Sequence, residues 1–96
     1  MYTTDKLYQI REIDVLRKAG VVIPIILRGA SPSITVYVSE SKPATIADMV
    51  DGIPDVSPFT GNLLLLDAMF RYVAFVGTTD GIEINNITLD EIADIS

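Results

Sequence analysis

Apolar and polar side chains alternate along much of the chain, which is the pattern of β-strands. The alternation is clearest over residues 34–39, Ile-Thr-Val-Tyr-Val-Ser, where every second side chain is expected to face a core. Residues 21–28 instead form a continuous, largely β-branched run between Gly20 and Gly29, which is typical of a strand buried on both faces. Pro24 has no N–H for a neighbouring strand, so we predict an edge strand there, or one broken at a bulge.

The second half of the chain also favours strands. The final segment, residues 87–95, alternates as a last strand, or begins a short helix through a capping pair of Thr88 and Glu91. Further strands are predicted at residues 63–66, 70–76 and 82–84, with a turn at 77–81 before the last of them.

Residues 4–19 admit two interpretations. As a helix, their apolar residues recur at every third position, and Arg17, Lys18 and Gly20 suit a helix C-terminus. As strands, apolar and polar residues alternate over much of the same stretch. The end signals taken alone favour the helix.

Residues 40–61 form the longest loop-like region, with one or two helical turns expected at 45–50. Loops on a rigid scaffold are the usual place for function, and Asp48, Asp51 and Asp55 are the candidate binding residues here. Calcium takes oxygen ligands from such loops. The spacing of the three aspartates is not that of a helix–loop–helix calcium site, so solvated charge is the favoured interpretation. We therefore predict no metal or other cofactor.

Charge and composition argue against several classes of function. Thirteen acidic against seven basic residues give a net charge of −6, which disfavours nucleic acids and anionic membranes as partners. The chain has no histidine to activate a serine, no cysteine for a disulfide or thiolate site, and no Gly-rich phosphate loop. We therefore predict no catalytic activity, and we expect a soluble protein without a signal peptide.

The apolar content is high for a chain of 96 residues, which we expect to fold as a single domain, 1–96. Hydrophobic residues make up 49% of the sequence and the mean hydropathy is +0.40. This surplus indicates that some apolar surface meets a partner, although an ordinary core is the alternative explanation. The interface candidates are Ile23, Ile25 and Leu27 of the expected edge strand, together with Leu64 and Leu66.

Three strand-like segments, Ile34-Thr-Val-Tyr-Val-Ser39, Phe70-Arg-Tyr-Val-Ala-Phe-Val-Gly77 and Ile87-Thr-Leu-Asp-Glu-Ile92, resemble the galactose-binding-like (discoidin, or coagulation-factor type C) β-sandwich. Residues 8–15 are similar to another strand of that family, whereas Ala74 stands where the family has a second arginine. The resemblance implies a jelly-roll-like sandwich that binds glycans, lipids or proteins through loops at one end, without catalysis.

The sequence thus predicts a mainly β fold: a small antiparallel, jelly-roll-like β-sandwich with one or two short helical segments. An α+β fold with an N-terminal helix is the alternative. The predicted function is that of a non-catalytic structural subunit, which forms a homo-oligomer with other protein subunits in a larger symmetric assembly, such as the capsid decoration or tail layer of a phage virion. The alternatives are a glycan- or protein-binding module of galactose-binding-like type, and a small α+β regulator with an acidic face.

Overall fold

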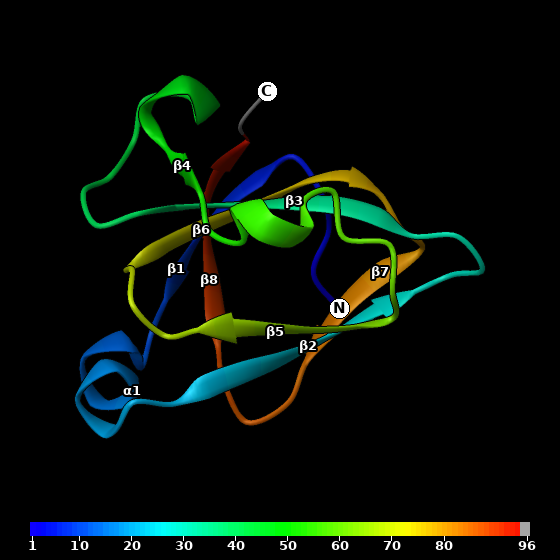
Figure 1. Ribbon diagram of the computed structural model, residues 1–96. Helices are drawn as coiled ribbons and strands as arrows, with labels where there is room; N and C mark the ends of the chain where they lie inside the picture. The colour runs from blue at the N-terminus through cyan, green and yellow to red at the C-terminus, as the bar shows by residue number, and fades with distance from the viewer. Residues whose placement is uncertain (95–96) are drawn as a thin grey trace.

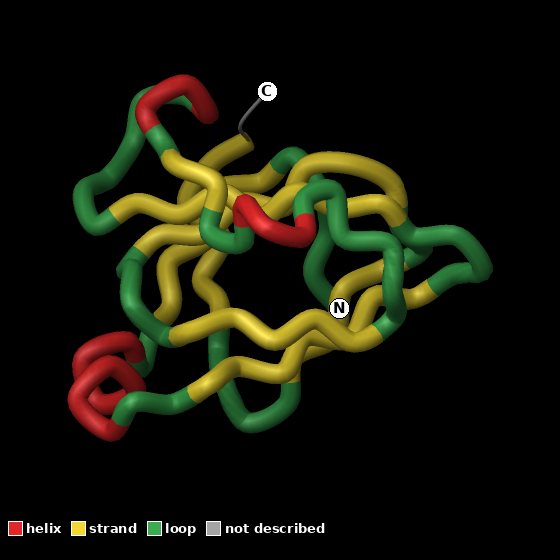
Figure 2. The backbone as a smooth tube through the Cα atoms, viewed as in Figure 1, coloured by secondary structure: helices red, strands yellow, loops and turns green. Residues whose placement is uncertain are grey.

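The computed structural model describes residues 1–94, most of whose regular structure is β-strand (Figure 2). The strands are β1 (Lys6–Ile10), β2 (Val22–Arg28), β3 (Ser33–Ser39), β4 (Val50–Asp51), β5 (Leu63–Asp67), β6 (Tyr72–Thr78), β7 (Gly81–Ile84) and β8 (Leu89–Asp94). They form two antiparallel sheets, one in the order β4-β3-β6-β1-β8 and the other in the order β5-β2-β7 (Figure 1). The predicted small antiparallel β-sandwich is therefore confirmed.

Helix is confined to short segments, drawn in red in Figure 2: α1 (Ile13–Ala19) and the 3-10 turns η1 (Ile46–Asp48) and η2 (Pro54–Val56). Each interpretation of residues 4–19 was right for part of the segment, because β1 is followed directly by α1. Gly20 ends α1 in the left-handed region, at φ +67°. The bonds from Gly20 N–H to Arg17 and from Val21 N–H to Leu16 form a Schellman motif. None of the helices in residues 1–94 has the length and apolar character needed to cross a membrane.

The main core lies between the two sheets and is built from inward-facing residues of every strand except β4. In β3, Ile34, Val36 and Val38 are at most 3% exposed, whereas the residues between them point the other way. Phe75 of β6 is fully buried in the same cluster. Burying each such side chain contributes roughly 1.5–3 kcal/mol to folding, so this shared core holds the layers together.

β2 is the central strand of the small sheet, so the prediction of an edge strand in this segment is wrong. Leu27 donates its N–H to the carbonyl of Asn62 on the β5 side, and successive residues of a strand bond to opposite sides. The nitrogen of Pro24 therefore faces the β7 side. The β2–β7 ladder ends at the pair of Ile25 and Ile84, so no strand there needs a donor from the proline.

The residues predicted to form a subunit interface lie in the core instead, which corrects that prediction. They are Ile23, Ile25, Leu27, Leu64 and Leu66, and each is at most 4% exposed. Side chains alternate between the two faces of a sheet, and these residues belong to the inward set. The outward residues of the same two strands are the ones available to a partner.

The chain changes sheets between β6 and β7, in the segment where a turn was expected at residues 77–81. β6 lies in the large sheet, whereas β7 pairs with β2 in the small one. A Cβ atom on Gly77, at φ +137°, would lie 2.0 Å from the carbonyl oxygen of Ser33, so only glycine fits this position. The final segment, residues 87–95, contains strand β8 rather than a helix, and residue 95 lies outside the described residues.

Candidate functional site

Part of the predicted binding loop, residues 40–61, covers the outer face of the large sheet, whereas Ile53 and Phe59 of the same loop pack against the main core. Ile46 and Met49 pack against Leu7 and Ala74, in an apolar cluster separate from the main core. Met49 is only 7% exposed. This part of the loop therefore has a packing role, and it covers the apolar centre of that face.

The three loop carboxylates are not brought together. Asp48 accepts hydrogen bonds from two backbone N–H groups beside the start of η1, at 3.2 and 3.3 Å. Asp51 accepts bonds from the N–H of Ile53 and the hydroxyl of Ser57, both at 2.9 Å. Asp55 is exposed in η2. Within residues 1–94, no three acidic side chains converge as a metal-binding group, and two of the candidates stabilise local turns.

A network of four charged side chains fastens α1 to the large sheet. Arg71 bonds Asp14 of α1 at 2.8 Å and lies 3.8 Å from Glu40, which also pairs with Arg17 at 3.0 Å. The hydrogen bond from Arg71 lowers the pKa of Asp14. These partners are far apart in sequence, so no local pattern indicated the network. Its two positive and two negative charges offset one another, which indicates a structural role, although the Nε of Arg17 is buried without a hydrogen-bond partner among the described residues.

The outer face of the small sheet, in contrast, is apolar and uncovered by the described residues. Val22, Leu63 and Leu65 are 46%, 57% and 59% exposed. Pro24 lies beside Leu65, and Ile26 lies beside Leu63, on the neighbouring strand. We call these five residues the outer patch. They are the immediate sequence neighbours of the residues that the sequence analysis selected.

Charged residues border the outer patch. Arg28 and Glu83 form an ion pair at 2.7 Å across β2 and β7, and Asp67 lies opposite Val22 at the far end of β5. An apolar patch with a polar rim is characteristic of surfaces that bind other molecules.

β5 is also an edge strand whose outer backbone groups are unpaired. It bonds to β2 alone, through the residues that alternate with Leu63, Leu65 and Asp67. Within residues 1–94, no hydrogen bond satisfies the backbone groups of Leu63 or Leu65, or the N–H of Asp67. These groups face the free edge, where a further strand would find donors and acceptors in place.

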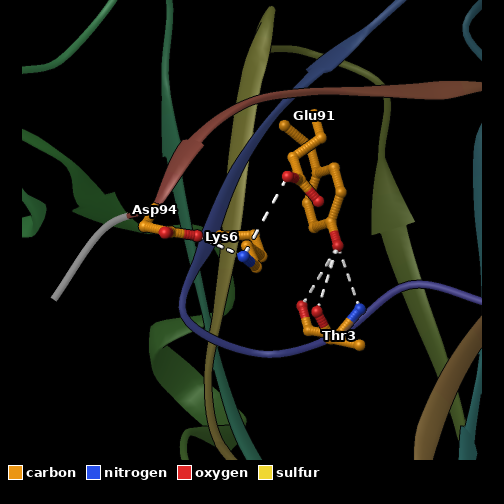
Figure 3. Close-up of polar contacts among 5 residues, drawn as sticks. Thr3, Lys6, Glu91 and Asp94 are labelled. Carbon is orange, nitrogen blue, oxygen red and sulfur yellow. Dashed lines mark hydrogen bonds and ion pairs between the residues drawn. The ribbon is translucent and has the colours of Figure 1, made fainter.

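The other sheet edges carry features that hinder such pairing. β4 has two residues, and β7 is bridged by Tyr2, whose N–H lies 2.7 Å from the carbonyl oxygen of Ile82. β8 is charged: Figure 3 shows Lys6 of β1 reaching both Glu91 and Asp94. Short edges, charged edges and covered edges all discourage strand addition.

Another ion pair adds to the charge on β8. Arg11 holds Asp90 at 2.5 Å and lowers the pKa of that carboxyl group through their hydrogen bond. β5, by comparison, has one charged residue, Asp67, at its end. Among the sheet edges formed by residues 1–94, the unprotected apolar one is therefore β5.

Comparisons with known proteins give no match, whether with family models, curated proteins or solved structures. The resemblance to the galactose-binding-like sandwich therefore stays a prediction. The observations that bear on function are those of the chain itself, chiefly the outer patch and the free edge of β5.

Proposed function

We propose that this protein is a non-catalytic structural subunit, which assembles with other protein subunits through the outer patch and the free edge of β5. One observation carries the proposal: the two sheets differ in how their outer faces are covered. Ile46 and Met49 of the loop pack on the outer face of the large sheet, whereas no described segment packs on the outer patch of the small sheet.

Burial energetics support an interface on this face. Removing apolar surface from water contributes about 25 cal/mol per Å², and a fully buried leucine gains roughly 1.5–3 kcal/mol. Leu63 and Leu65 forgo most of this gain in the isolated chain, where each is more than half exposed. A partner that covers the outer patch recovers this free energy of burial. The alternation of β5 places the side chains of Leu63 and Leu65 on the same face.

We propose a symmetric particle, such as the decoration or tail layer of a bacteriophage, as the setting of this assembly. A subunit in such a layer repeats a small number of contacts around the symmetry axes, so it needs a defined adhesive surface. The compact sandwich, with one apolar outer patch and one unprotected edge, fits that requirement.

A charge placed in the outer patch tests the proposal. We expect Leu65→Glu to weaken self-association by at least about a hundredfold, because burying an unpaired carboxylate costs several kcal/mol. Light scattering after size exclusion should then give the 10.5 kDa mass of the single chain for the variant and a larger mass for the unmodified protein.

Val15→Glu is the matched control. Val15 is an exposed apolar residue on α1, at 72% exposure, and lies outside the outer patch, so the same added charge should leave the mass unchanged. Loss of association in both variants would indicate a general charge effect. Retention of the larger mass by Leu65→Glu would refute the outer patch as the interface.

A further inference from the structure

We infer that the free edge of β5 pairs with β5 of a second copy of this chain, antiparallel and about a two-fold axis at Leu65. This inference rests on the proposed function and specifies both the partner and the contact. It joins two three-stranded sheets into one six-stranded sheet across the subunit boundary.

The unpaired backbone groups determine the register. With the axis at Leu65, that residue lies opposite itself, and Leu63 lies opposite Asp67 of the second copy. Leu63 and Leu65 direct both backbone groups to the free edge, so the Leu65 pair is a hydrogen-bonded pair. Asp67 offers its N–H to the carbonyl of Leu63 of the second copy, while its own carbonyl accepts the N–H of Met69. Moving the axis to either neighbour would place residue 61 or residue 69, outside β5, opposite one of the three.

The charges of the strand are compatible with a second copy as the occupant. Asp67 is the one charged residue of β5, and this register places it opposite Leu63 of the partner. The two aspartates then lie at opposite ends of the paired strands, about 14 Å apart. That separation exceeds the Debye length of about 8 Å at physiological ionic strength, so their repulsion is largely screened.

The pairing also extends the apolar surface. The outer patches of the two copies meet along the joined β5 strands, with Leu65 beside Leu65 of the partner at the centre. Cross-strand contacts between apolar side chains add to the backbone bonds. The resulting six-stranded sheet presents one continuous apolar face to further subunits of the assembly.

Site-specific disulfide formation tests the register, because the chain contains no cysteine of its own. In the inferred dimer, the Cα atoms of the two Leu65 residues lie about 5.5 Å apart, within the range that a disulfide spans. We expect Leu65→Cys to form a disulfide-linked dimer under mild oxidation. Because Leu65 is exposed, the substitution removes no core contact.

Leu63→Cys is the matched control, since Leu63 has nearly the same exposure and lies on the same face. Two copies of this variant place their thiols about 14 Å apart, too far to link. Mixing Leu63→Cys with Asp67→Cys should restore the link, between the two different chains.

The outcomes separate this inference from the proposed function. Equal linking of Leu65→Cys and Leu63→Cys would overturn the register. If the unmodified protein associates but Leu65→Cys does not link, the edge pairing is wrong, while assembly through the face stands. If the unmodified protein is monomeric at every concentration, the proposed function itself fails.

Discussion

Asp51 and Asp55 lie four residues apart in the same loop, yet only Asp51 has bonds that hold the loop in place. Its carboxylate accepts the N–H of Ile53 and the hydroxyl of Ser57, whereas no hydrogen bond of Asp55 is seen within residues 1–94. Asp51 therefore has a structural role, whereas Asp55 is a solvated carboxylate.

We expect Asp51→Ala to lower the free energy of unfolding by about 1–2 kcal/mol, because the partly buried N–H of Ile53 loses its acceptor. The hydroxyl of Ser57 keeps a second acceptor, the carbonyl oxygen of Ile53 at 2.9 Å. Asp55→Ala should stay within about 0.5 kcal/mol of the unmodified protein, as is usual at an exposed site. Denaturation in urea, followed by far-ultraviolet circular dichroism, measures both. Equal losses in the two variants would contradict the structural role of Asp51.

Single-residue roles in this loop were only partly predictable from sequence. The carboxylates were found by composition and loop position, and solvated charge was the favoured explanation for all of them. The turn bonds of Asp48 and Asp51 depend on how η1, β4 and η2 fold against the large sheet. That geometry has no local signature in the sequence.

Among the secondary-structure elements, β5 is the one whose orientation matters most. Leu64 and Leu65 are chemically identical neighbours, but Leu64 is 1% exposed and Leu65 is 59% exposed. The alternation of the strand separates a core residue from a surface residue.

Truncating each leucine tests this orientation. Leu64→Ala should cost about 3 kcal/mol, since it removes buried methyl groups and leaves a cavity. Leu65→Ala should cost less than about 1 kcal/mol in the monomer, because its side chain is largely in water. Guanidinium unfolding at low protein concentration gives both values. The reverse ranking would show that β5 turns its other face to the core.

Most of the strands were predictable, although β1 was left open against a helix and β4 was not expected. The facing of two strands was not predictable. Over residues 34–39, polar residues mark the outward face, and the strand was predicted correctly. The leucine run at 63–66 has no polar residue to mark either face, so the inward set was taken for the outward one. The continuous apolar run of β2 left the same ambiguity.

At the scale of the whole molecule, the arrangement of the sheets depends on contacts between distant segments. The crossing from β6 to β7 and the pairing of β1 with both β6 and β8 join residues that local patterns cannot relate. The mainly β content followed from the strand patterns, and the sandwich was expected from the resemblance to the galactose-binding-like family, but the strand order followed from neither. That order is what makes β5 an edge and leaves the outer patch uncovered.

The most direct test of assembly through the small sheet is the mass of the unmodified protein in solution. Light scattering after size exclusion should be recorded over about a hundredfold range of concentration, because association depends on it by mass action. At the highest concentration we expect a mass of at least twice the 10.5 kDa of one chain, as a dimer or a larger symmetric assembly. A mass of one chain at every concentration would contradict assembly through the outer patch and the edge of β5.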